Sequence, residues 1–156
     1  GSMKGRNMKK LILILAAVAA LGLTTVLAAK PVPSGTISAP TGDVSLGGAV
    51  IFDYTAENTG GANLRIQVFC YQAGAVTPEN PTGLVYGMAL NADPDSGVAT
   101  AEVQPFVLGG GSSDWLENGG PADCTATLFF WGHRGAFTPL ATISFPAAGY
   151  LRHSST

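Results

Sequence analysis

Residues 64–70 (LRIQVFC) decide the fold, because apolar side chains occupy every second position and Arg65 and Gln67 lie between them. An alternation with a period of two is typical of a half-buried β-strand. This segment belongs to residues 62–73, the longest run after residue 29 that lacks Gly and Pro, and even this run has no helical period. The sequence therefore predicts an all-β domain.

Residues 124–131 (CTATLFFW) alternate in the same way. The pattern places Cys70 and Cys124 on inward faces, whereas Phe129 and Trp131 make the opposite face of the second strand aromatic. Further strands are predicted at residues 49–56, 84–90, 98–108 and 140–145, with a weaker one at 35–39. Turn-forming Gly, Pro, Asn and Asp separate these segments. Six or seven short strands of this kind predict an antiparallel β-sandwich.

The first 29 residues have the composition of an export signal. Gly1-Ser2 ahead of Met3 resembles a cloning scar, and a basic segment precedes an unbroken apolar run at residues 11–23 and a small-residue exit at 24–29. This layout predicts a signal peptide helix cleaved near Ala28 or Ala29, and a protein secreted or held at the cell envelope by general secretion. A retained membrane anchor is the alternative, because residues 11–29 approach the length that spans a bilayer.

Removal of those 29 residues from the 156 leaves 127, which suit one domain at residues 30–150 with a tail at 151–156. This part carries four basic and ten acidic groups, a net charge of −6. Charged residues are only 12% of the chain, which excludes a coiled coil or a disordered acidic segment. No basic cluster follows the leader, so nucleic acid is not an expected partner, and a membrane is one only if the leader is retained.

The two cysteines are predicted to form a disulfide, because an exported chain reaches an oxidising compartment. A Cys70–Cys124 bridge closes a loop of more than fifty residues. The chain-entropy model gives such a bridge roughly 4 kcal/mol of stabilisation.

Over about residues 35–146 the chain resembles an immunoglobulin-like domain. The wide separation of the two cysteines carries the resemblance, together with residues 122–126 (ADCTA), which are similar to the approach to the F strand. The chain differs in having Ala122 at the tyrosine-corner position and Trp115 nine residues before the second cysteine. The resemblance implies an immunoglobulin-like sandwich, and a small jelly roll is the alternative fold.

The sequence does not determine which two strands the disulfide joins. Counting strands from the amino end puts Cys70 on the third strand, which pairs C with F. If residues 36–56 form one bent strand, Cys70 lies on the second, and the bridge joins B to F between the sheets, as in immunoglobulin domains.

The sequence predicts a protein without enzymatic activity, because His133 and His153 are the only side chains suited to act as bases near neutral pH. Residues 131–135 (WGHRG) form a turn between two strands. This turn is either an exposed hairpin tip or a recognition loop that uses Trp131, His133 and Arg134. Trp115 lies in a long loop, either as a plug over the end of the sandwich or as a contact for a glycan or protein.

No cofactor is expected, apart from one candidate calcium site. Asn91, Asp93, Asp95 and Glu102 match positions 1, 3, 5 and 12 of a calcium loop. Position 6, where that loop requires Gly, is Ser96, and no helices flank the segment. The competing interpretation is an Asx-type turn.

Two functions follow. The first is a non-catalytic module for binding or adhesion to a protein or glycan at a surface, through Trp115, Trp131, His133 and Arg134. The second is a structural subunit that self-associates through sheet edges or an aromatic face into a filament, coat or virion decoration. Low charge and an open Phe129–Trp131 patch favour assembly, whereas a covered patch favours the binding module.

Overall fold

The computed structural model describes residues 29–92, 97–103, 115–116 and 119–149. Residues 1–28, which make up all but the last residue of the predicted leader, and the predicted tail at 151–156 lie outside these residues, so signal cleavage and the anchor alternative stay predictions. From Val32 onward the described residues belong to one compact unit, which holds the disulfide and every buried core residue of the described chain. No helix in the described part of the chain is long and apolar enough to span a membrane.

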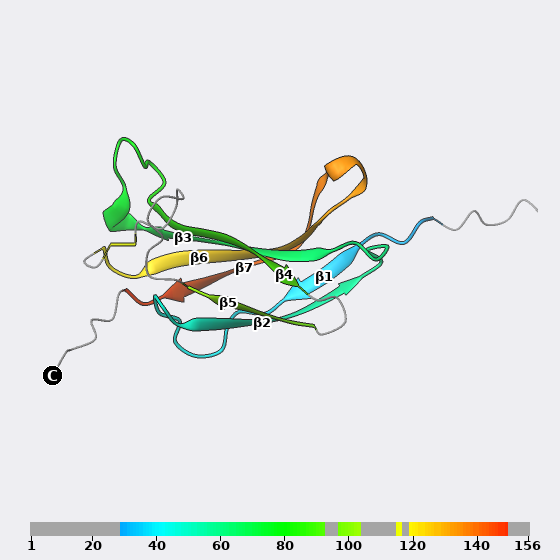
Figure 1. Ribbon diagram of the computed structural model, residues 1–156, viewed down its shortest axis with the longest axis horizontal. Helices are drawn as coiled ribbons and strands as arrows, with labels where there is room; N and C mark the ends of the chain where they lie inside the picture. The colour runs from blue at the N-terminus through cyan, green and yellow to red at the C-terminus, as the bar shows by residue number, and fades with distance from the viewer. Residues whose placement is uncertain (1–28, 93–96, 104–114, 117–118, 150–156) are drawn as a thin grey trace, which may run out of the picture. The chain divides into compact units, whose positions relative to one another are not determined.

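In the part of the chain that is described, seven strands form two antiparallel sheets that pack face to face (Figure 1). The strands are β1 (Ser34–Ile37), β2 (Ala49–Glu57), β3 (Leu64–Gln72), β4 (Leu84–Ala92), β5 (Val98–Glu102), β6 (Ala122–Trp131) and β7 (Phe137–Ala147). One sheet has the order β1-β2-β5 and the other β4-β3-β6-β7. Two short 3-10 turns, η1 (Ala73–Ala75) and η2 (His133–Gly135), follow β3 and β6. The predicted all-β, two-layer architecture is confirmed.

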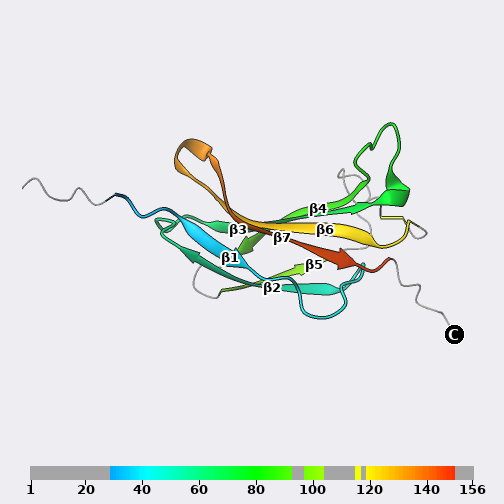
Figure 2. The ribbon, with the colours of Figure 1, turned by 180° about the vertical axis from the view of Figure 1, so that it is seen from behind.

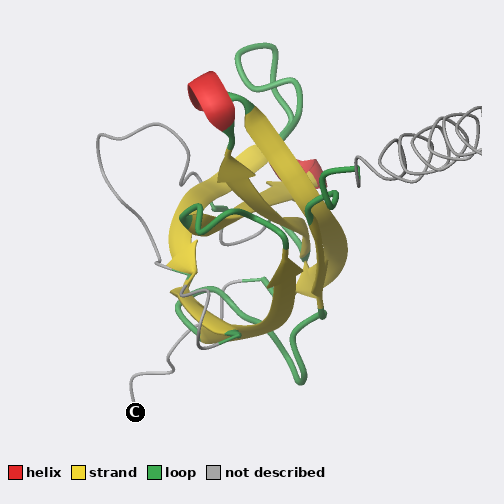
Figure 3. Cartoon of the chain, turned by 90° about the vertical axis from the view of Figure 1, so that its right-hand side faces the viewer, coloured by secondary structure: helices red, strands yellow, loops and turns green. Residues whose placement is uncertain are grey.

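The buried side chains of the core come from both sheets, which face each other in the end-on view of Figure 3. Alternation along β3 buries every second side chain, and β6 buries its matching positions. Phe52 of β2 meets Phe145 of β7 edge to face, with ring centroids 5.6 Å apart. Because each sheet covers the apolar face of the other, neither is stable alone.

Most strands end within two residues of their predicted bounds, and two differ by more. The strand predicted at 98–108 is described only as far as Glu102, and residues 104–108 lie outside the described chain. The strand predicted at 140–145 begins earlier, at Phe137, and runs to Ala147. It carries Pro139 and Pro146, which an edge strand tolerates because their missing N–H groups need no partner strand.

The disulfide is confirmed, and it lies within one sheet. Cys70 on β3 directly faces Cys124 on the neighbouring β6, with an S–S distance of 2.02 Å. Cys70 therefore belongs to the third strand. The one-bent-strand alternative is wrong, because β1 and β2 are separate strands paired to each other, and no bridge crosses the core.

Candidate functional site

The most distinctive surface is the side of the four-stranded sheet that faces away from the core, called here the outer face. Arg65, Gln67, Phe69 and Tyr71 lie on it because they alternate with the buried residues of β3. The odd-numbered residues of β6 face the same way. Two loops rise on this side, the β6–β7 hairpin at one end and the β3–β4 connection at the other (Figures 1 and 2).

Three rings gather where the β6–β7 hairpin leaves the sheet, and Phe129, Trp131 and Phe137 are called here the hairpin cluster. The ring centroid of Phe129 lies 5.6 Å from that of Trp131 and 4.7 Å from that of Phe137. Trp131 and Phe137 meet edge to face at 5.7 Å. Phe129 points outward yet is only 2% exposed, whereas Trp131 is 52% and Phe137 47% exposed. The predicted outward aromatic face is confirmed, with Phe129 as the floor beneath two open rings.

The hairpin tip holds two of the predicted site residues. His133 and Arg134 are exposed in η2, and the Gly132 N–H closes the turn by donating to the Ala136 carbonyl at 2.6 Å. Arg134 has a φ of 60°, in the left-handed region that an arginine rarely occupies. The predicted turn is confirmed, and it connects the two strands that carry the rings of the hairpin cluster.

A cavity of about 410 Å³ opens at the other end of the outer face, around Tyr71. Asp123 and Thr125 of β6 line it, together with Ser144 and Pro146 of β7. A phenol ring, a carboxylate and two hydroxyls therefore meet in one hollow.

Between the hairpin cluster and this cavity the outer face combines polar groups with the half-buried Phe69 and carries little charge. The hydroxyls of Thr127 and Thr142 lie 3.0 Å apart across β6 and β7. Arg65 Nε donates to Asn91 Oδ1 at 3.3 Å, and Arg65 is opposite Phe129 in the register. Hydroxyl, amide and guanidinium groups thus link the two aromatic ends.

Trp115 does not belong to this surface. It is only 6% exposed and packs in the core, so the interpretation as a partner-binding loop aromatic is wrong and the one as a plug is supported. Its position follows from the buried side chain of Gln72, which bonds to the backbone of Leu116 and Gly120. The Trp115 indole N–H is buried, and no hydrogen-bond partner for it lies among the described residues.

The calcium hypothesis gains no support from its two described residues. Asn91 lies on β4 and accepts the Arg65 hydrogen bond, while Glu102 ends β5 in the other sheet. Asp93 and Asp95 lie outside the described residues. Among those that are described, no three His, Cys, Asp or Glu side chains group as metal ligands.

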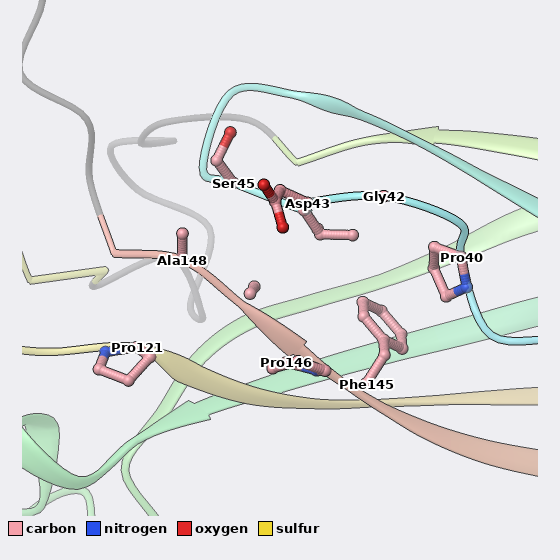
Figure 4. Close-up of a pocket in the computed structure, with 10 residues that line it drawn as sticks. Pro40, Gly42, Asp43, Ser45, Pro121, Phe145, Pro146 and Ala148 are labelled. Atoms are coloured by element: carbon pink, nitrogen blue, oxygen red, sulfur yellow. The ribbon is translucent and has the colours of Figure 1, made fainter.

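A second cavity, of about 440 Å³, lies between the β1–β2 connection and the end of β7 (Figure 4). Its walls are mostly apolar and include Pro40, Pro121, Phe145 and Pro146, with Asp43 and Ser45 at the rim. It holds none of the site residues predicted from the sequence.

The chain matches no family model, no curated protein and no solved structure. The outer face is therefore the feature of the molecule that indicates its function. Sequence reasoning missed Tyr71 and Phe137. Continuing the alternation of β3 by one residue identifies Tyr71, but only the pairing of Phe137 with Trp131 across the hairpin identifies the second ring.

Proposed function

We propose that the protein is a non-catalytic carbohydrate-binding module, and that a sugar polymer lies along the outer face. The observation that carries this proposal is the pair of half-exposed rings, Trp131 and Phe137, beside a face of hydroxyl and amide groups. Pyranose rings have the complementary chemistry, because their C–H faces stack on aromatic rings while their rims exchange hydrogen bonds with polar side chains.

The length of the face favours a polymer over a single sugar. Arg65, which faces Phe129, and Tyr71, in the cavity, are six residues apart on β3, or roughly 20 Å at about 3.4 Å per residue. A chain crossing this distance contacts the hairpin cluster at one end and the cavity at the other. Arg134 and His133 supply donors at the hairpin end.

A protein partner or self-assembly through the hairpin cluster is supported less well. The patch is open, as the assembly hypothesis requires, but only Trp131 and Phe137 among its rings are exposed. Stable protein interfaces bury about 800 Å² on each partner around an apolar core. Here polar groups lie near the cluster on the same face: Thr127, two residues before Phe129, bonds to Thr142, and Arg65, opposite Phe129, bonds to Asn91.

We also propose that the two sheets form an immunoglobulin-like sandwich. The order β1-β2-β5 over β4-β3-β6-β7 corresponds to strands A-B-E and C′-C-F-G of an immunoglobulin-like sandwich. After β1 the chain crosses to β7, where Ser45 forms a parallel bridge with Ala148. A disulfide in the core is compatible with export, and supports a location outside the cytoplasm.

Retention on insoluble polysaccharide tests the binding function. Residues 30–156 are sedimented with cellulose, chitin and peptidoglycan sacculi, the sacculi both before and after protease digestion. We expect retention on at least one polymer, weakened about fivefold by Trp131→Ala or Phe137→Ala, since an aromatic stacking contact contributes about 1 kcal/mol.

Ile51→Ala is the matched control, because Ile51 is also an exposed apolar side chain but lies on the other sheet. Its retention should equal that of the wild type. Absence of retention on every polymer, or equal losses in all variants, contradicts the proposal. Retention that disappears after protease treatment indicates a protein partner.

Arg134→Gly separates the guanidinium from the hairpin conformation. Glycine adopts a φ of 60° without steric cost, so the variant should be more stable than the wild type by about 1 kcal/mol. We expect weaker retention on the polymer despite the higher melting temperature. Retention that is unchanged would remove Arg134 from the binding surface.

A further inference from the structure

We infer that two copies of this chain form a dimer by pairing their β4 strands edge to edge. β4 is the last strand of the four-stranded sheet and pairs with β3 on one side. Within the described part of the chain no strand pairs with its other side, called here the open edge. An open edge presents backbone N–H and C=O groups that fit another strand.

β4 lacks the features that normally block such pairing. Its nine residues, LVYGMALNA, include no charged residue and no proline. The other outermost strands of the described sheets are blocked: β7 carries Pro139 and Pro146, β5 has five residues and ends at Glu102, and β1 has only four residues. Short strands, charges and prolines are the usual protection against edge pairing.

The register identifies which backbone groups face the open edge. The Gln72 N–H donates to the Gly83 carbonyl, so the backbone groups of Gln72 and of every second residue before it on β3 face β4. Their register partners Tyr86 and Met88 consequently face β3. The N–H and C=O groups of Gly87 and Ala89, which alternate with them, face the open edge.

The sequence of β4 is complementary to itself about Met88. Antiparallel pairing on a two-fold axis at Met88 places small Gly87 opposite Ala89 of the second copy and large Tyr86 opposite Leu90. The Gly87 and Ala89 groups then form about four hydrogen bonds between the copies. This size match favours a second copy over an unrelated peptide, and because the contact is isologous it closes as a dimer instead of growing into a filament.

Met88 is the side chain that such a dimer covers. It lies on the inner face of β4, opposite the buried Val68. It remains 39% exposed because β4 is the edge strand of its sheet. The Tyr86 hydroxyl holds it in place, lying 2.8 Å from the Met88 sulfur and donating to the Glu102 carbonyl at 3.0 Å. Burial raises the pKa of Tyr86, which keeps this hydroxyl protonated.

The dimer has a consequence that rests on the proposed function. A two-fold axis across a continuous sheet is perpendicular to it, so both outer faces lie on the same side. Two hairpin clusters then meet one polymer surface, and binding gains avidity without new contacts.

Sedimentation of residues 30–156 tests the dimer, from about 1 µM to about 300 µM, where weak to moderate interfaces associate. We expect the mass to rise toward twice that of the monomer. Ala89→Pro removes an N–H from the open edge and leaves the β3 ladder intact, and Met88→Lys places charges opposite each other. Each should weaken the dimer at least tenfold. Thr142→Lys, an exposed change on β7, is the control and should leave it unchanged.

Hydrogen exchange of the wild type provides a test that needs no variant. The Gly87 and Ala89 amides should be protected at high concentration and exchange freely at low concentration, while the Met88 amide stays protected at both. A monomer at every concentration, or a dimer that persists in Ala89→Pro and Met88→Lys, overturns the inference. Trp131→Ala should lose polymer binding and still form the dimer, so failure of one proposal is distinguishable from failure of the other.

Discussion

Replacing both cysteines, Cys70→Ala with Cys124→Ala, should lower the free energy of unfolding by about 4 kcal/mol. The bridge joins residues 54 positions apart in the chain. Without it, the unfolded chain adopts more conformations, and its higher entropy favours unfolding. For a domain of this size the melting temperature should fall by roughly 15 °C. Urea denaturation of the variant and of the oxidised wild type measures the free energy of unfolding, and thermal unfolding of the same two proteins measures the melting temperature.

Val68→Ala is the packing control for this prediction. Val68 is buried two residues before Cys70 and faces Ala126, so the variant loses about 2 kcal/mol of packing without losing a covalent bond. Loss of the bridge should also steepen the denaturant dependence, because the unfolded chain expands, whereas Val68→Ala should leave the slope unchanged. Two free thiols per chain in the purified wild-type protein would contradict the bridge itself. A double variant as stable as Val68→Ala would contradict its contribution to stability.

Gln72→Met should lower the free energy of unfolding by about 3 kcal/mol, although it keeps the length of the side chain. The Gln72 amide donates to the carbonyls of Leu116 and Gly120 at 3.2 and 2.8 Å, and its oxygen accepts the Leu116 N–H at 2.8 Å. Methionine leaves these three backbone groups without their partner. A buried polar group that loses its hydrogen bond costs about 1–3 kcal/mol.

The same substitution should release Trp115, which follows the backbone that Gln72 holds. In a Trp131→Phe background, the fluorescence of the remaining Trp115 should shift to longer wavelength in Gln72→Met as the indole becomes hydrated. Gln67→Met, on the half-buried outer face of the same strand, is the control and should change neither stability nor fluorescence. Equal effects of the two substitutions would show that the Gln72 amide does not hold this loop.

The alternation of inward and outward side chains predicted β3 and β6, the two strands that carry the disulfide. Because neighbouring side chains of a strand face opposite sides, the sequence around Cys70 and Cys124 indicated both the strands and their inward faces. The alternation does not determine which strands are neighbours. That Cys70 faces Cys124 within one sheet is a property of topology, so the sequence left two courses for the bridge.

In the candidate site, too, alternation within a strand was predictable and contacts between distant segments were not. Trp131 was predicted to face outward because it follows the alternation of β6, but Phe137 joins it only through a hairpin register with a bulge between Leu128 and Phe129. Trp115 was not placed by the sequence, because its burial depends on hydrogen bonds from Gln72, 43 residues earlier in the chain. Long-range contacts of this kind leave no periodic signal.

Nuclear magnetic resonance of the two indole N–H groups tests most directly whether the outer face binds sugar. Residues 30–156 labelled with ¹⁵N are titrated with soluble oligosaccharides of cellulose, chitin and peptidoglycan. We predict that one of them shifts the Trp131 indole signal and the amides of Phe137 and Arg65, while the buried Trp115 indole signal stays in place. If none of the sugars moves Trp131, or the Trp115 signal moves alone, the outer face is not the binding surface.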